Sequence, residues 1–168
     1  MEATQSNAVQ QPQGIRSTTL RVARAKPALA KSLPEKVGRH SKRVDTALPG
    51  KHTRLLYDRL SRKEARVLVQ LRTGMTKLNT YLHRTRATSS DLCACGQARE
   101  TVEHFLFRCR QWTGHRVEML QCTDIHKSNI SFYLGGKSLS DDNNWSPNMQ
   151  AVQATIRFAM STGRLATD

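Results

Sequence analysis

A short segment rich in cysteine and histidine places the strongest constraint on the fold. The segment CACGQARETVEHFLFRC, residues 93–109, holds three of the chain's four cysteines and one of its six histidines. Three thiolates and one imidazole suit a tetrahedral Zn²⁺ ion, and such a site is structural because no coordination position remains for water. The sequence therefore predicts a structural zinc site whose ligands are Cys93, Cys95, His104 and Cys109.

The spacing of these ligands sets conditions on the backbone around them. Gly96 follows the first two cysteines and can adopt the positive φ that turns the chain beneath a metal. Thr101 can cap a helix that carries the next ligand. His104 and Cys109 are five positions apart, which leaves them roughly 140° apart on a regular α-helix of about 3.6 residues per turn. We therefore expect the last helical turn to loosen before Cys109.

Two alternatives to this site remain open. A single residue separates Cys93 from Cys95, a tighter spacer than usual, so buried thiols without a metal are the first alternative. A rival ligand set lies downstream and consists of His115, Cys122 and His126. Within that set, Cys122 is also explained as a small core residue.

The rest of the chain predicts a small helical domain. Only 38% of its 168 residues are apolar, which indicates one domain with a modest core. Ser61 and Glu64 form a capping-box pattern ahead of a helix that Gly74 ends. Further patterns predict helices over 55–60, 77–84 and from a Ser146–Pro147 start to Gly163, with a short strand or packed loop at 130–137.

The predicted fold class is therefore mainly α. It consists of a helical domain with a Cys-Cys-His-Cys zinc knuckle over residues 51–165, preceded by a disordered basic arm over residues 1–50. The arm is polar, carries prolines among its basic residues and includes one short helical pattern at 17–25.

Charge is distributed very unevenly along the chain. The net charge is +14, and residues 1–90 carry 19 Lys and Arg against 5 Asp and Glu, whereas residues 91–168 carry 8 of each. Such an excess favours polyanionic partners, and with few aromatic residues it favours contact with nucleic-acid phosphates over base stacking. Each cation taken singly is explained as solvated surface. As a set they predict an RNA- or DNA-binding face formed by Arg54, Arg59, Arg62, Lys63, Arg66, Arg72, Lys77, Arg84 and Arg86.

Localisation follows from what the sequence lacks. No segment approaches the ~20 apolar residues of a membrane span, so we expect no membrane partner. The first residues show no basic start followed by an apolar run, which predicts a nuclear or cytoplasmic rather than a secreted protein. Reduced thiols are expected there, and clustered cysteines then indicate metal ligands before disulfides. Trp112 and Trp145 are assigned to packing, with base stacking as the alternative.

Four motifs in order resemble a known family. LRTG at 71–74, YLHR at 81–84, CACG at 93–96 and ETVEHFLFRC at 100–109 resemble the C-terminal region of the reverse-transcriptase polyprotein of non-LTR (LINE-type) retrotransposons. Many of these polyproteins end, after an RNase H domain, in a helical segment and a Cys-x-Cys, His-x4-Cys zinc knuckle. The resemblance covers about residues 45–165. It implies the same four metal ligands and a role in handling the element's RNA or its target DNA.

The carboxylates that such polyproteins use for catalysis do not appear in this sequence. Polymerase activity needs paired aspartates and RNase H activity needs carboxylates that hold Mg²⁺. The one aspartate pair, Asp141–Asp142, lies in a polar stretch that predicts a solvated turn. We therefore expect a detached tail of the polyprotein, not an enzyme. The alternatives are a protein-interaction module that docks through the last helix, and a non-functional retroelement remnant.

Overall fold

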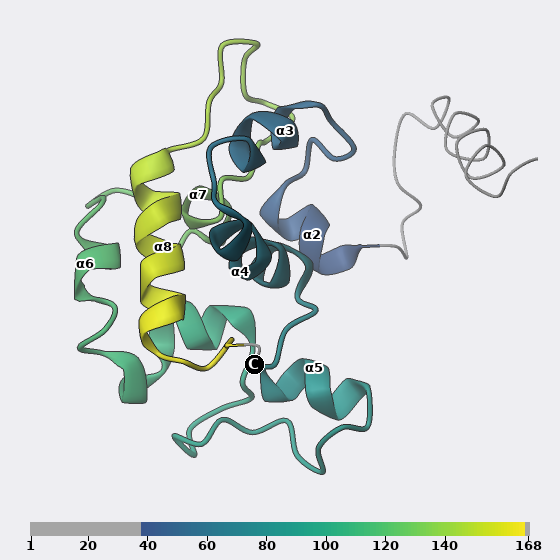
Figure 1. Cartoon of the computed structure of the whole chain (residues 1–168), viewed down its shortest axis with the longest axis vertical. Coiled ribbons are helices and arrows are strands. Elements are labelled where there is room, and N and C mark those ends of the chain that lie inside the picture. The colour runs from purple at the N-terminus through teal and green to yellow at the C-terminus, as the bar shows by residue number, and fades with distance from the viewer. Residues whose placement is uncertain (1–37, 167–168) are drawn as a thin grey trace, which may run out of the picture. The chain divides into compact units, whose positions relative to one another are not determined.

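Two long helices form the centre of the domain. Helix α4 (Arg62–Thr73) and helix α8 (Met149–Ser161) pack against each other, as Figure 1 shows. Each helix turns an apolar face toward the other because its apolar residues recur every three or four positions. Fully buried side chains of the two helices include Leu68 and Leu71 on α4, and Val152, Ile156 and Ala159 on α8.

Shorter helices surround this pair. The computed structural model describes residues 38–166, and within them the chain is helical with no strand longer than one isolated bridge. The mainly α fold predicted from the sequence is thus confirmed. The shorter elements are α2 (Arg39–Val44), α3 (His52–Tyr57), α5 (Asn79–Arg84), η2 (His104–Arg108), η3 (Arg110–Trp112), α6 (Val117–Leu120) and α7 (Ile130–Tyr133).

The capping box predicted for α4 is present. The Ser61 N–H donates to the Glu64 carboxylate at 2.8 Å, and the Glu64 N–H donates back to the Ser61 hydroxyl at 3.4 Å. Gly74 ends the helix with a φ of 69°, and its N–H donates to the Gln70 carbonyl at 3.0 Å. Both ends of α4 therefore follow from local sequence, because each terminal group finds its partner within four residues.

Two local predictions are wrong. Helix α8 begins after Asn148, whose side chain accepts from the Ala151 N–H at 3.0 Å, and not at Ser146. Residues 130–133 form helix α7 instead of a strand or loop, because the Asn129 side chain caps that turn by accepting from the Phe132 N–H at 3.2 Å. In both cases an asparagine offers the carbonyl oxygen that a helix N-terminus needs. The Asp141–Asp142 stretch does form the expected turn, with the Ser138 N–H donating to Asp141 at 2.7 Å.

The domain includes residues that the sequence predicts to be in the disordered arm. Helix α2 packs on α4 and α7, and Val44 and Asp45 are buried. Asp45 accepts from Arg72 at 2.6 Å and from the His52 ring at 2.8 Å. This buried network joins the α2 end to α3 and α4, so the packed domain begins before residue 51. The rest of the arm up to residue 37, with the helix predicted at 17–25, lies outside the described residues.

Candidate metal centre

The four predicted ligands lie together. One ligand atom from each of Cys93, Cys95, His104 and Cys109 lies within 4.8 Å of the other three. The Cys93 and Cys109 sulfurs are 3.6 Å apart, far beyond a disulfide bond, and the Cys95 sulfur lies 3.2 Å from His104 Nε2. Zn–S bonds of about 2.3 Å at a tetrahedral angle place two sulfurs about 3.8 Å apart. The pocket between these atoms therefore fits a tetrahedral metal ion.

A tight hairpin presents the first two ligands. Leu92 and Arg99 form an antiparallel bridge, and the Cys93 N–H donates to the Ala98 carbonyl at 2.8 Å. The turn between them closes at Gly96, which has a φ of 75° and open space where a side chain would start. A Cβ would meet no atom there, so the constraint is the left-handed backbone, which glycine adopts without strain. The turn holds the two sulfurs on one side of the hairpin.

A widened helical turn presents the other two ligands. Residues His104–Arg108 form a π-helical turn, and the Cys109 N–H donates to the His104 carbonyl at 2.7 Å. This bond spans five residues where an α-helix spans four, so it brings residues five positions apart onto the same side. The predicted loosening before Cys109 is therefore realised as a π turn. The Thr101 hydroxyl caps its start by accepting from the His104 N–H at 3.1 Å.

Arg116 holds the end of this turn, and sequence reasoning did not single it out. Its guanidinium donates to three carbonyls, those of Leu106 at 2.8 Å, Phe105 at 3.1 Å and Cys109 at 2.7 Å. The side chain is buried, and it also lies over the Phe158 ring. Carbonyls at a helix end lack partners within the helix, and a buried arginine can satisfy several at once. No local pattern in the sequence marks a residue seven positions beyond a ligand for this role.

A second buried network fixes the hairpin to the rest of the domain. Glu100, at the hairpin's end, accepts from Arg164 through both carboxylate oxygens at 2.9 and 2.6 Å. The Asn79 N–H donates to the same carboxylate at 2.7 Å, and the Asn79 side chain donates to the Leu92 carbonyl at 2.6 Å. The bidentate geometry between the Arg164 guanidinium and the Glu100 carboxylate makes this a strong ion pair. The chain beyond α8 and the start of α5 thus both support the metal-binding hairpin.

Burial and hydrogen bonding perturb the ligands differently. Removal from water, together with the neighbouring thiols of Cys95 and Cys109, raises the pKa of Cys93 to about 12. A hydrogen bond from the Gln97 backbone lowers the pKa of Cys95, and burial lowers the pKa of His104. The imidazole is therefore neutral near neutral pH, as a metal ligand must be, whereas Cys93 must lose its proton when a cation binds.

Accessibility of the four ligands supports a structural rather than a catalytic centre. Cys93, His104 and Cys109 are buried, with 4%, 5% and 0% of their surfaces exposed, and Cys95 is half-buried. A metal held by four protein ligands at such a depth has no open position for a substrate or a reactive water. A metal bound by these four ligands can therefore join the hairpin to the π turn and stabilise the folded domain.

The rival ligand set does not assemble. Among residues 38–166 only the four predicted ligands gather as a potential metal group. His126 stacks on Phe132 instead, and the Cys122 thiol lies half-buried against the core. Trp112 contacts Phe105 edge to face at a ring distance of 6.4 Å, and Trp145 contacts His52 at 5.8 Å. Both tryptophans thus take the packing role expected of large rings.

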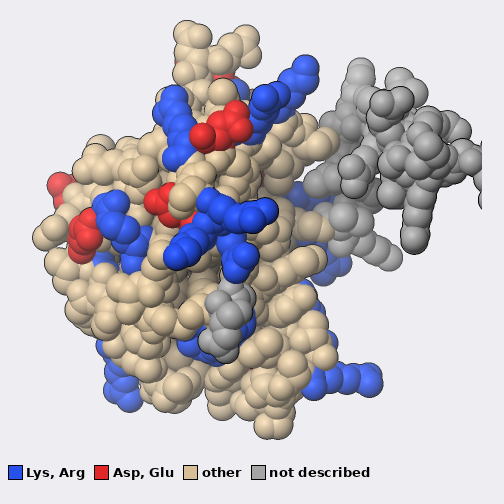
Figure 2. Space-filling model, viewed as in Figure 1, with Lys and Arg blue, Asp and Glu red and all other residues tan. Residues whose placement is uncertain are grey.

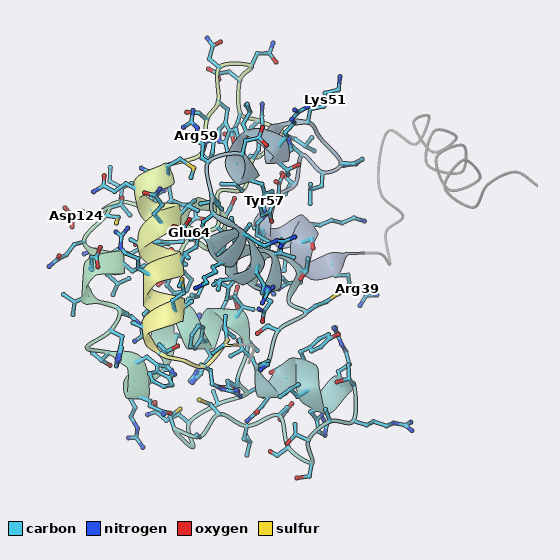
Figure 3. The ribbon with its side chains drawn as sticks, in the orientation of Figure 1. Arg39, Lys51, Tyr57, Arg59, Glu64 and Asp124 are labelled. Atoms are coloured by element: carbon cyan, nitrogen blue, oxygen red, sulfur yellow. The ribbon has the colours of Figure 1, made fainter. Side chains whose placement is uncertain are left out.

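The nine residues predicted to contact phosphate are either exposed, half-buried or buried in the structure. Most members are exposed on or beside α3, α4 and α5, and Figure 2 shows Lys and Arg side chains gathered on the face that carries α3 and α4. Arg59 extends from the α3–α4 connection into solvent, and Lys51, at the start of α3, is also exposed (Figure 3). Lys77 is half-buried and donates to the Ala166 carbonyl at 2.5 Å. The exposed members are Arg54, Arg59, Arg62, Lys63, Arg66, Arg84 and Arg86.

Arg72 does not belong to this surface, which corrects the prediction. It is only 5% exposed, pairs with Asp45 and donates to the Leu134 and Gly135 carbonyls at 2.5 and 2.9 Å. Arg72 lies on the inner face of α4, where burial forces a charged group to find partners. It stabilises the fold and cannot reach a phosphate.

Comparison with protein-family models, with curated proteins and with solved structures finds no match to this chain. No helix in the described part of the chain is long and apolar enough to cross a membrane.

Proposed function

We propose that this chain is a zinc-stapled module that binds RNA or DNA through phosphate contacts. The proposal is carried by two features of the same domain, the closed cluster of three cysteines and one histidine and a surface rich in exposed cations. In this proposal the metal orders the hairpin and the π turn, and the cations of α3, α4 and α5 meet the polyanion. The module would correspond to a C-terminal part of a non-LTR retrotransposon reverse transcriptase, separated from its catalytic domains.

Zinc is the metal that this donor set favours. Thiolates select soft or borderline cations, and an S₃N set with tetrahedral spacing is typical of structural zinc sites. A Zn²⁺ ion with three thiolates carries a net single negative charge. Arg116, whose guanidinium bonds to the Cys109 carbonyl, and Arg110, which donates to the Cys95 carbonyl at 3.3 Å, place positive charge beside it. These two cations therefore favour the deprotonated, metal-bound form of the cysteines beside them.

Several cations on the outer face are exposed to solvent. Arg54 pairs with Asp58 at 3.4 Å, but both side chains are largely exposed, and such a pair contributes little and can be exchanged for a phosphate contact. Arg59 and Lys63 are exposed on the same face. A surface of this kind binds through the release of counterions from the nucleic acid, which makes the affinity fall steeply with salt.

Filter binding across a salt series tests the proposal. The zinc-loaded chain should bind an oligonucleotide with an affinity that falls linearly on a logarithmic salt scale, and Lys63→Gln should reduce the slope by about one. Lys127→Gln is the matched control, since it removes the same charge from the exposed loop between α6 and α7 and should leave the slope unchanged. An affinity insensitive to salt would contradict phosphate contact.

A groove beside α8 favours protein interaction as the second candidate function. The groove measures about 210 Å³ and lies between α4 and α8, with Lys63 and Arg66 beside apolar Val67, Ala159 and Met160. Met160 is 47% exposed and offers an apolar side chain at this groove. If this groove binds the main partner, Met160→Asp should abolish that binding while Lys63→Gln leaves it largely intact. Measurement of partner binding by both variants separates the two functions.

A further inference from the structure

A pocket lies between α2 and α5, next to the segment that leads into the metal-binding π turn. It has a volume of about 210 Å³ and is lined by His40 and Arg43 of α2, by Thr80, Tyr81 and Arg84 of α5, and by residues 100–103 that lead into the π turn. We call this the α2–α5 pocket. Drug-sized ligands occupy pockets of roughly 300–1,000 Å³, so this volume suits a smaller group such as a single ring system.

One polar group in the α2–α5 pocket has no partner among the described residues 38–166. The Thr80 hydroxyl oxygen is buried, and that part of the chain offers it no hydrogen bond. Burial of a hydroxyl without a partner costs free energy, and such groups therefore mark positions where a ligand or water completes the bonding. The other walls include Leu78 and Val102, which are buried and apolar. The pocket thus combines apolar walls with an unsatisfied hydroxyl.

The titratable groups of the pocket show what kind of ligand fits. His40 Nε2 lies 2.8 Å from the Leu71 carbonyl, so this nitrogen carries the hydrogen and the neutral ring keeps Nδ1 as an acceptor. Burial lowers the pKa of His40, which keeps the ring neutral near neutral pH. Arg43 forms an ion pair with Glu103 at the rim. Glu100 also lines the pocket, so a bare anion inside would face two carboxylates.

Arg84 provides a flat cation at the mouth of the pocket. Its guanidinium lies over the Tyr81 ring at 5.1 Å from the centroid, and the side chain is otherwise exposed. Guanidinium planes and aromatic rings are the groups on which unpaired nucleic-acid bases stack, while the edges of those bases form hydrogen bonds with polar side chains. A base carries no charge, is planar and has donors and acceptors on its edge. It therefore matches the walls, the hydroxyl and the charge balance of the pocket.

We propose that the α2–α5 pocket receives one unpaired base of a single-stranded nucleic acid, with Arg84 and Arg43 at its mouth near the adjoining phosphates. The proposal rests on the proposed function and sharpens it, because a duplex has no free base to offer. The proposal also implies that the metal affects the shape of the pocket. Thr101 lines the pocket and caps the turn that carries His104, so loss of the metal would disturb a pocket wall.

The test compares base-containing and abasic strands of equal length and charge. Fluorescence anisotropy with the zinc-loaded full chain should show at least about five-fold tighter binding to the base-containing strand, as expected for stacking of a single base. Thr80→Val replaces the hydroxyl with a methyl group of similar size and should reduce this preference by about 2- to 10-fold. Binding to the abasic strand and to a duplex should not change. Thr80→Val should melt at the same or a higher temperature, since it removes an unsatisfied buried group.

A matched control and a direct titration complete the experiment. Thr85→Val, an exposed substitution at the C-terminal cap of the same helix and outside the pocket, should keep the preference for the base-containing strand. Titration with adenosine monophosphate should shift the backbone amide NMR signals of Thr80 and Val102. Equal, salt-dependent binding to the two strands would overturn the pocket proposal and leave the proposed function standing. Absence of binding to any nucleic acid would overturn the proposed function, and unmoved Thr80 and Val102 signals would then overturn the pocket as well.

Discussion

Replacement of Arg116 by methionine should weaken both the fold and the metal site. The methionine side chain keeps most of the apolar stem but loses the three hydrogen bonds to the Phe105, Leu106 and Cys109 carbonyls. Hydrogen bonds from a charged group are worth about 1.5–3 kcal/mol each but are not additive, and their loss leaves three buried carbonyls without these partners. We therefore expect the free energy of unfolding to fall by about 3–5 kcal/mol.

The same change should act on the metal through the position of Cys109. Residues that orient a ligand without touching the metal typically change metal affinity by about 10- to 100-fold, and we expect a loss in that range for Arg116→Met. Urea unfolding of the zinc-loaded chain measures the first effect, and competition with a chromophoric chelator measures the second. Arg157→Met is the matched control, because Arg157 pairs with Glu118 at the surface, where such a pair is worth at most about 1 kcal/mol. Equal losses for the two variants would refute this role of Arg116.

Two further predictions concern pH and helix capping. Since binding needs thiolates and the pKa of Cys93 is raised to about 12, zinc affinity should rise with pH by about two to three powers of ten per unit near neutrality, measured by chelator competition; an affinity independent of pH would contradict proton release. The pKa of His104 is lowered, so its contribution is complete above the ordinary histidine pKa and is lost as the pH falls through the folded-state value, which should release the metal in acid. Ser61→Ala should lower the free energy of unfolding by about 1 kcal/mol in urea titrations, whereas Ser140→Ala in an exposed loop should not.

The metal centre was largely predictable because its constraints are local. Ligand chemistry and spacing select four residues within seventeen positions, and the five-residue step from His104 to Cys109 requires a departure from α-helical geometry. The structure meets this requirement with a π turn. The sequence could not specify that form, because a loosened end and a widened turn both bring the two ligands together. It also could not indicate Arg116, whose role depends on which carbonyls the π turn leaves without partners.

Errors in the fold prediction come from competition between local signals and from contacts distant in sequence. Ser146 and Asn148 are both good caps, and the choice between them depends on how α8 packs. Residues 130–133 are apolar enough for a strand, but the cap at Asn129 and the contact with α8 favour a helical turn. In the sequence, nothing distinguishes Arg72 from the exposed basic residues near it. Only its pairing with Asp45, 27 positions away, reveals that it is buried.

The α2–α5 pocket illustrates a site that sequence analysis cannot find. Its walls come from three segments, around residues 40, 80 and 101, and none of them carries a recognised motif. Composition placed Arg84 in a phosphate-binding set, which agrees with a position at the mouth of the pocket. The neighbouring Tyr81 ring and the unsatisfied Thr80 hydroxyl become meaningful only when the fold places them together.

In the proposed function, one metal ion folds this domain through four side chains. The decisive measurement is the zinc content of the purified chain, taken together with its thermal unfolding. We expect one tightly held zinc per chain, and we expect Cys93→Ser or His104→Ala to lose both the metal and the cooperative unfolding transition, because binding free energy is folding free energy at such a site. Cys122→Ser, outside the cluster, should keep both. A metal-free chain that still unfolds cooperatively would contradict the claim.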